Sequence, residues 1–392
     1  MKILFIHNKY KQYGGEDVAV ELETAVLIKK GHEVRSIFFD NTTIGSFFSK
    51  ITAGFRSVYN FSSARLISKT ILQFKPDVIH IHNLFFIASP SVIYAANKHK
   101  VPVILTLHNY RLICANALLL RNNQVCELCT QKKFPLAGIK YKCYRDSFGG
   151  SAFVTAITGI HKISATWKNK VSTYITLNEF SRSKLLNSSL GVPEDKMITK
   201  PNFIPDPGEG NSDRENFFLF AGRIAKEKGV HVLAKAFTYM PGYKIIIAGD
   251  GPERKLLQEN FSPYSNIFFT GQMEKKQVSE YMKKCKAFIC PSIWYEVAPL
   301  TIIEAFATGT PVIASRLGSM AELIIDGFNG LHFIAGDADD LRRKIELFIK
   351  DTEQHSLFYK NARQTYQEKY HEDIHYNAVL KIYEDAIRKN NV

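Results

Sequence analysis

The chain has 392 residues, of which 45% are hydrophobic and 22% charged, an ordinary balance for a globular protein. This composition excludes a disordered chain, a coiled coil and a collagen-like fibre, and the length suggests two or three domains. The sequence holds no run of about 18 apolar residues, so we expect no membrane-spanning helix. The N-terminus, MKILFIHN, turns polar after six residues and is expected to form a buried first strand rather than a signal peptide.

The formal net charge of +14 is concentrated in one half of the chain. Residues 1–200 hold 27 Lys and Arg against 12 Asp and Glu, whereas residues 201–392 hold 24 against 25. Such an asymmetry indicates an anionic partner: nucleic acid, an anionic membrane surface or a phosphorylated substrate. The alternative explanation is the Lys-biased codon usage of an AT-rich genome. No nucleic-acid-binding module is recognisable, so we expect no nucleic acid partner.

Short β-rich runs alternate with helical stretches in both halves, which is typical of parallel sheets with helical crossovers. The segment 200–216 is rich in Pro, Gly, Asn and Asp and predicts a linker. We therefore predict an α/β protein with two doubly wound domains, residues 1–204 and 205–372, followed by a helical segment at 373–392. The expected strands are 2–7, 33–39, 77–82, 101–107 and 172–177 in the first domain, and 217–221, 243–248, 266–270, 287–290 and 311–314 in the second. Ligands of such sheets bind at the carboxyl ends of strands, so we expect the site in a cleft between the domains.

The segment PSIWYEVAPLTIIEAFATGTPVIAS carries Glu296 and Glu304, eight positions apart. Glu296 is expected in the loop before a helix and Glu304 inside that helix. Backbone N–H groups at the helix N-terminus form an anion site with the positive end of the helix dipole. The residues expected there are Ala298, Leu300 and Thr301. Because apolar residues surround Glu304, its carboxylate needs a hydrogen-bonding ligand or a charged partner.

This segment resembles the Glu-x7-Glu signature of the retaining glycosyltransferases of family 4, which have the GT-B fold. The resemblance covers nearly the whole chain and includes Gly14-Gly15, GHEV (31–34), DVIHIHN (77–83), TLHNYR (106–111), ITKPNFIPD (198–206), AGRIAKEKGV (221–230) and IIAGDGPER (246–254). It implies two Rossmann-like domains that face a cleft, with the acceptor on the N-terminal domain and the nucleotide-sugar on the C-terminal domain. It also implies that the C-terminal helix returns to the N-terminal domain.

The resemblance implies a role for each matched residue. Arg223 and Lys228 would neutralise the charge that grows on the leaving diphosphate, without a metal ion. Glu304 would grip the ribose hydroxyls, Glu296 would contact the donor sugar, and His108 would touch a sugar hydroxyl at the reacting face. The expected catalytic residues are thus His108, Arg223, Lys228 and Glu296, and the expected donor-binding residues are Gly14, Gly15, Arg223, Lys228, Gly249, Glu296, Ala298, Leu300, Thr301 and Glu304.

Other residues of the first half are less informative. The Gly14-Gly15 pair lets the backbone approach a phosphate or sugar closely, but it does not form G-x-G-x-x-G, which argues against a nicotinamide dinucleotide site. His80 and His82 alternate in the strand expected at 77–82 and are expected to face opposite sides of it. Neither is given a role.

Four cysteines, Cys114, Cys126, Cys129 and Cys143, form C-x11-C-x2-C-x13-C in an insertion at 112–146. Four thiols with one CxxC suit a structural zinc, and four unconnected reduced thiols are the equal alternative. An iron–sulfur cluster or a disulfide is less favoured in a reducing compartment.

The stretch 44–74 holds no acid and predicts one basic amphipathic helix. Its apolar positions are Ile44, Phe47, Phe48, Ile51, Phe55 and Val58, and its basic ones are Lys50, Arg56, Arg65 and Lys69. Such a helix lies in an anionic membrane interface or packs on its own sheet.

The resemblance to family 4, taken with these features, implies a retaining, metal-independent hexosyltransferase. We expect a UDP- or GDP-linked donor and a glycan or lipid-linked glycan acceptor of bacterial envelope polysaccharide synthesis. The expected location is the cytoplasm, with attachment to the inner face of the cell membrane as a further expectation. The alternatives are a nucleotide-sugar epimerase of the same fold and a non-catalytic nucleotide-sugar-binding protein.

Overall fold

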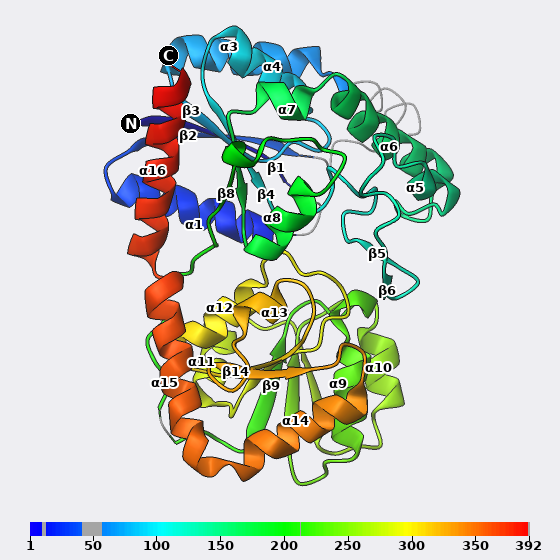
Figure 1. Cartoon of the computed structure of the whole chain (residues 1–392). Coiled ribbons are helices and arrows are strands. Elements are labelled where there is room, and N and C mark those ends of the chain that lie inside the picture. Colours follow the sequence, from blue (N-terminus) through cyan, green and yellow to red (C-terminus); the bar gives the residue numbers. More distant parts are fainter. Residues whose placement is uncertain (10–12, 41–56, 212, 391–392) are drawn as a thin grey trace. The chain divides into compact units, whose positions relative to one another are not determined.

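The computed structural model describes residues 1–9, 13–40, 57–211 and 213–390, which divide into two compact units (Figure 1). Unit 1 comprises Met1–Leu119, Cys126–Asn202 and His375–Val392, and unit 2 comprises Leu120–Val125 and Phe203–Ile374. Leu120–Arg121 (β5) and Gln124–Val125 (β6) form a small antiparallel hairpin. Each unit is described by itself below.

Unit 1 is built on a six-stranded parallel sheet in the order β2-β1-β3-β4-β7-β8. Its strands are β1 (Lys2–Lys9), β2 (Glu33–Asp40), β3 (Val78–Asn83), β4 (Val103–Leu107), β7 (Thr173–Thr176) and β8 (Met197–Thr199). Every residue of β3, β4 and β7 is buried. These strands are therefore covered on both faces, as parallel sheets usually are.

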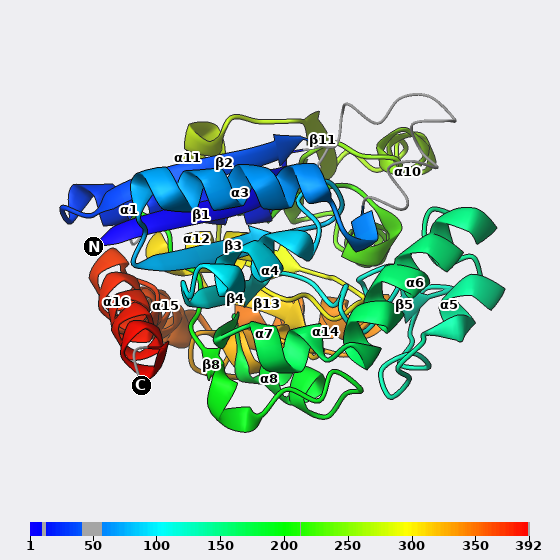
Figure 2. The ribbon, with the colours of Figure 1, turned by 90° about the horizontal axis from the view of Figure 1, so that it is seen from above.

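Helices cover both faces of this sheet. Figure 1 shows α3 and α4 over one face and α1 over the other, and both views place α16 on the opposite side of the unit from α5 and α6 (Figures 1 and 2). The helices are α1 (Gly15–Lys29), α3 (Phe61–Phe74), α4 (Ser91–Lys98), α5 (Leu136–Lys140), α6 (Phe148–Ile163), α7 (Thr166–Lys170), α8 (Glu179–Leu186) and α16 (Glu372–Asn390). From His375 onward α16 packs with unit 1, so the expected return of the C-terminal helix is confirmed.

The single helix predicted over 44–74 is wrong in its described part. Tyr59 and Asn60 are not helical, and the Asn60 side chain accepts the backbone N–H groups of Ser62 and Ser63. This cap starts α3 at Phe61, because Asn competes well for free N–H groups at a helix start. Ile44, Phe47, Phe48, Lys50, Ile51, Phe55 and Arg56 lie outside the described residues.

Unit 2 has a second six-stranded parallel sheet in the order β11-β10-β9-β12-β13-β14. Its strands are β9 (Phe217–Ala221), β10 (Lys244–Ala248), β11 (Ile267–Gly271), β12 (Phe288–Cys290), β13 (Val312–Ser315) and β14 (Gly330–Phe333). The helices are α9 (Val230–Thr238), α10 (Arg254–Asn260), α11 (Lys275–Lys284), α12 (Leu300–Ala307), α13 (Met320–Leu323), α14 (Ala338–Lys350) and α15 (Thr352–Lys369). Apolar residues of α9 and α14 pack with one face of the sheet in a buried core, and α12 packs against α11 and α15.

In each sheet the strand that comes first in the sequence has later strands on both sides. In unit 1, β1 lies between β2 and β3, and in unit 2, β9 lies between β10 and β12. Loops after neighbouring strands then diverge at the carboxyl edge and leave room for a ligand there. The predicted fold, two doubly wound α/β domains, is confirmed.

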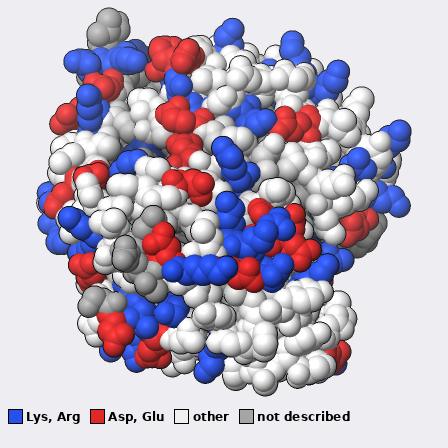
Figure 3. All heavy atoms as spheres, turned by 60° about the horizontal axis from the view of Figure 1, so that its bottom comes forward, with Lys and Arg blue, Asp and Glu red and all other residues white. Residues whose placement is uncertain are grey.

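On the face that Figure 3 displays, basic and acidic side chains are interspersed. Within the described ranges no helix has the length and apolar character that crossing a bilayer requires.

Candidate active site

In unit 2 the sequence-predicted donor residues follow three adjacent strands. Gly249 follows β10, Arg223 and Lys228 follow β9, and Glu296 follows β12. These strands are neighbours in the sheet, and all run parallel. Their carboxyl ends therefore bring these loops together at one edge of the sheet.

Lys228 and Glu296 form the centre of this edge. Lys228 Nζ donates a hydrogen bond to Glu296 Oε1 at 2.6 Å, and Ser292 Oγ donates to the same oxygen at 2.6 Å. Glu296 is buried, whereas the Lys228 side chain keeps a quarter of its surface exposed. Burial alone would lower the pKa of Lys228, but the Glu296 carboxylate outweighs burial and raises it. Lys228 is therefore a fixed cation, and Ser292 is a partner that sequence reasoning missed.

Arg223 is the more accessible cation of the pair. About half of its side chain is exposed, and its guanidinium pairs with Glu227 one helical turn further on. An exposed guanidinium with free donors is suited to bind a diphosphate in a bidentate way. The sequence-predicted pair of cations is thus present, with one fixed member and one accessible member.

Two glycines make the loops of this edge fit closely. A Cβ on Gly249 would lie 1.9 Å from the carbonyl oxygen of Gly222, and one on Gly229 would lie 1.9 Å from that of Pro291. Gly229 also has φ = +67°, in the left-handed region. Gly249 therefore shapes the β10 turn by lacking a side chain.

Helix α12 begins directly after the β12 loop. Leu300 and Thr301 are its first two residues, and Ala298 precedes it. Glu304 lies one turn inside, partly exposed, and the structure gives its carboxylate no hydrogen-bond or ion-pair partner within the described residues. Burial raises the pKa of Glu304. This carboxylate is the unpaired acid that the sequence predicts to need a ligand.

The sequence-predicted residues of unit 1 also lie at strand ends. Gly14 and Gly15 form the start of α1, after β1, where the Gly14 N–H donates to Asp17 Oδ2 at 2.9 Å. His108 follows β4, and its Nε2 lies 2.9 Å from His82 Nδ1 at the end of β3. Burial lowers the pKa of His108 to about 3, so its imidazole is neutral at physiological pH.

His80 and His82 face the same side of β3, not opposite sides as expected. Their rings lie 4.2 Å apart, because residues two positions apart in a strand share a face. Both approach Glu23 of α1, whose Oε1 lies 2.9 Å from His80 Nδ1 and 3.7 Å from His82 Nε2. Sequence reasoning missed Glu23, although it interrupts the apolar stripe of α1.

Glu23, His80 and His82 have metal-ligand chemistry, but the carboxylate is already occupied. Lys200 Nζ and His375 Nε2 both lie 2.9 Å from Glu23 Oε2. Burial alone would raise the pKa of Glu23, but the Lys200 ammonium and the hydrogen bonds of His80 and His375 hold it well below its usual range. An ammonium group at a metal's place would repel the ion, so this group is a buried charge network rather than a metal site.

The four cysteines of the insertion do not form a ligand set in the structure. No three of their four sulfur atoms lie mutually within 4.8 Å of one another. Cys114 Sγ donates to Asn116 Oδ1, and Cys129 Sγ donates to the Pro135 carbonyl. The zinc site stays a prediction that would require these thiols to rearrange.

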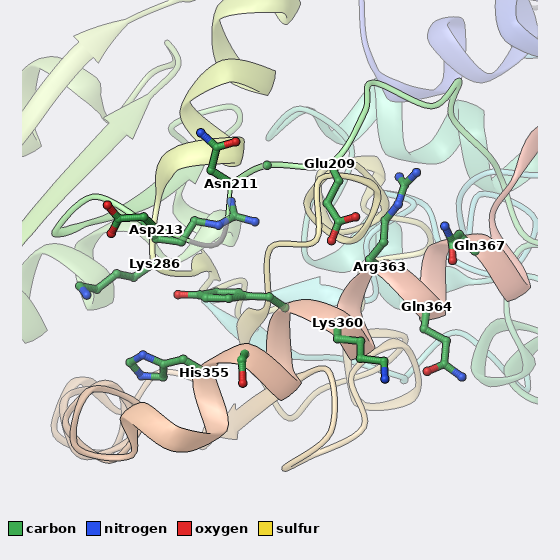
Figure 4. A pocket seen from close by; sticks show the side chains of 13 residues that line it. Glu209, Asn211, Asp213, Lys286, His355, Lys360, Arg363, Gln364 and Gln367 are labelled. Carbon is green, nitrogen blue, oxygen red and sulfur yellow. The ribbon is translucent and has the colours of Figure 1, made fainter.

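A pocket of about 760 Å³ lies elsewhere in unit 2, between the linker and α15 (Figure 4). It shares no residue with the expected donor set. Figure 4 shows Glu209 and Asp213 among the basic side chains that line it. The chemistry of the donor set, not this pocket, therefore identifies the candidate site.

Comparisons with known proteins agree with this geometry. The family "Glycosyl transferases group 1" matches residues 206–365, and "Glycosyltransferase Family 4" matches residues 13–132. An uncharacterized glycosyltransferase of Methanocaldococcus jannaschii is 27% identical, over 98% of both chains. Alpha-monoglucosyldiacylglycerol synthase of Streptococcus pneumoniae is 27% identical over 84% of this chain and 70% of its own. The O-antigen biosynthesis glycosyltransferase WbnH of Escherichia coli is 28% identical over 55% and 62%.

The fold also resembles that of solved structures. A crystal structure of Anabaena HepE in complex with UDP superposes with a TM-score of 0.70 at 15% identity, over 98% of this chain and all of that one. The two family matches lie on the two units and contain most of the residues described above. The chain therefore belongs to the retaining family 4 (group 1) glycosyltransferases, nucleotide-sugar-dependent enzymes of the GT-B fold.

Proposed function

We propose that this enzyme transfers a hexose from a UDP- or GDP-linked donor to a glycan or lipid-linked glycan acceptor of envelope polysaccharide synthesis, with retention of configuration. Unit 2 binds the donor and unit 1 the acceptor. The observation that carries the donor assignment is the edge at β10, β9 and β12, where Arg223 and the Lys228–Glu296 ion pair lie in loops that follow neighbouring strands. The HepE complex with UDP supports testing UDP-linked donors first.

Each donor-site residue of unit 2 has a distinct task in this proposal. The negative charge on the diphosphate increases as the sugar leaves, and Arg223 and Lys228 stabilise that charge electrostatically without a metal. The Glu304 carboxylate accepts hydrogen bonds from two ribose hydroxyls, which supply the partners that it lacks. Glu296 contacts the sugar through the oxygen that Lys228 and Ser292 leave free.

The N-terminal loops of unit 1 have tasks of their own in this proposal. The start of α1 at Gly14 and Gly15 has open space where a Cβ of Gly14 would lie, so backbone can approach a ligand there. His108 contacts a hydroxyl of the sugar with a neutral imidazole.

We further propose that the acceptor is held at an anionic membrane surface. Support comes from two relatives, one named alpha-monoglucosyldiacylglycerol synthase and one named an O-antigen biosynthesis glycosyltransferase. Support also comes from exposed side chains of residues 136–148, which we call the apolar–basic face: Leu136, Tyr141 and Phe148 with Lys140, Lys142 and Arg145. Exposed apolar side chains with neighbouring cations fit an anionic lipid interface.

The test is incubation of the full chain with a panel of UDP-, GDP- and ADP-hexoses, with and without lipid-linked acceptors. Release of nucleoside diphosphate, with an α-anomeric product from an α-linked donor, is the expected result. Conversion of the donor to an epimer without release would support the epimerase instead. Binding without either reaction would support the non-catalytic alternative.

A further inference from the structure

A pair of imidazoles connects the candidate site of unit 1 to its core. His82 Nδ1 and His108 Nε2 are 2.9 Å apart, and the two rings stack with centroids 5.2 Å apart. Burial lowers the pKa of both side chains, that of His82 well below its usual value. Both are therefore neutral, and one of the two facing nitrogens carries the shared proton.

Electrostatics decides which nitrogen of His82 is protonated. Its Nε2 is buried, has no hydrogen-bond partner among the described residues and lies 3.7 Å from Glu23 Oε1. Glu23 is ionised, because Lys200 and His375 both hold its other oxygen. An N–H at Nε2 points its positive end toward this carboxylate, whereas a lone pair there would be repelled. His82 Nδ1 is then an acceptor.

The consequence is carried to His108. Its Nε2–H must donate to His82 Nδ1, which leaves Nδ1 of His108 unprotonated. That second nitrogen has no partner within the described residues, and His108 remains partly exposed. We propose that His82 is a positioning residue, which holds His108 as the Nε2–H tautomer so that Nδ1 accepts a hydrogen bond from a substrate hydroxyl. The substrate hydroxyl in this inference rests on the proposed function, whereas the tautomer of His108 does not.

The tautomer is measured first, on the full chain labelled with 15N-histidine. Long-range proton–nitrogen spectra distinguish a protonated from an unprotonated ring nitrogen, and the His82→Leu and His108→Gln variants assign the signals. We expect His108 protonated at Nε2 and unprotonated at Nδ1. A proton at His108 Nδ1 would overturn the proposal, and this result does not depend on finding a donor.

Activity then separates positioning from packing. His82→Leu removes the acceptor and should lower kcat about 10-fold, the cost of roughly one hydrogen bond, with little change in donor KM. His82→Asn keeps an oxygen near the place of Nδ1 and should restore most of the rate. Tyr383→Phe removes a hydroxyl that contacts His80 and Glu23 in the same network, so it is the matched control for lost core stability.

One further comparison excludes a purely structural role. It uses monodeoxy derivatives of the donor sugar, each of which lacks one hydroxyl group. With the derivative that lacks the hydroxyl contacted by His108, wild type and His82→Leu should react at equal rates. An equal loss for every derivative, or a loss in Tyr383→Phe as large as in His82→Leu, would show that His82 only packs. If no donor reacts at all, the proposed function fails while the nitrogen spectra still test the tautomer.

Discussion

Lys228 and Glu296 lie 68 positions apart in the chain and meet at 2.6 Å, in loops that follow the neighbouring strands β9 and β12. The ion pair joins two motifs that the sequence shows only separately. It also means that the cation expected at the diphosphate is held by an acid of the same site. Replacing either partner therefore changes both charge and stability.

We expect Arg223→Ala and Lys228→Ala each to lower kcat by ~10²–10³, the scale of losing one charged transition-state contact. The exposed Lys226, two positions before Lys228, offers a matched control, and Lys226→Ala should retain near-normal kcat. Steady-state kinetics with the identified donor measure this. Near-normal rates in both Arg223→Ala and Lys228→Ala would contradict the diphosphate assignment.

The same variants differ in stability. Arg223→Ala should change Tm little, because the guanidinium is largely exposed. Lys228→Ala should lower Tm, since it leaves the buried Glu296 carboxylate without its cation. Adding Glu296→Gln to Lys228→Ala should recover Tm without recovering activity. Thermal unfolding at pH 7 provides the measurement, and an unchanged Tm in Lys228→Ala would show that the pair is not formed in solution.

The Glu304 carboxylate is expected to cost stability in the ligand-free enzyme. Burial raises its pKa in the folded state, so ionisation disfavours folding as pH rises through the unfolded pKa of about 4.3. Glu304→Gln should therefore raise Tm at pH 7, by about 1 °C for a gain on the order of 1 kcal/mol in a chain of this length. At pH 3, below both the unfolded and the folded pKa, the difference should nearly vanish.

The same substitution that raises stability should weaken UDP binding. Glu304→Gln should lose most of the Tm increase that saturating UDP gives the wild type, because the amide is a weaker acceptor for ribose hydroxyls. Equal stabilisation of both proteins by UDP would contradict the ribose assignment.

The fold was readable from the sequence because its strongest signals are local. Continuous apolar runs such as 217–221 and 77–82 become strands β9 and β3 within one residue at each end. Strands β8 and β14 were missed because three or four residues carry too little periodicity. The donor motifs were found because each lies in one short segment.

The buried network of unit 1 could not be predicted in full. Glu23 lies on the same face of α1 as Ala19 and Val26, so a buried acid could have been inferred there from helical spacing. Its partners His80, Lys200 and His375 come from β3, from the segment after β8 and from α16, up to 352 residues away, so only the tertiary fold brings them together. His80 and His82 were expected on opposite faces of their strand, but side chains two positions apart in a strand point to the same face.

The transfer reaction is expected to need no metal ion, whether or not the insertion binds zinc. Transfer should persist in EDTA, because the side chains supply the positive charge at the diphosphate. Activity lost in EDTA and restored by Mg²⁺ would contradict this.

Zinc in the insertion is tested by metal analysis of the purified chain. The prediction is one zinc per chain, lost in Cys129→Ser and retained in Cys285→Ser, a buried cysteine of unit 2. Burial raises the pKa of Cys129 to about 11, so zinc must displace its proton and bind more weakly as pH falls. Absence of zinc in protein grown with added zinc would favour four reduced thiols.

The apolar–basic face makes a sharp prediction about membranes. The full chain should bind vesicles that contain anionic lipid and not neutral ones, since each Lys or Arg at the surface contributes about 1 kcal/mol. Binding should weaken as salt rises and the Debye length falls. The double variant Leu136→Ser/Phe148→Ser should reduce binding, because both side chains are more than 60% exposed and available to lipid.

Leu347→Ser in α14 is the matched control, an exposed leucine of unit 2 whose loss should leave vesicle binding unchanged. Donor hydrolysis without acceptor should stay the same in all three proteins, because none of these residues belongs to the donor set. Co-sedimentation at two salt concentrations measures the binding. Equal binding to neutral and anionic vesicles, or equal loss in Leu347→Ser, would show that the apolar–basic face does not dock on an anionic bilayer.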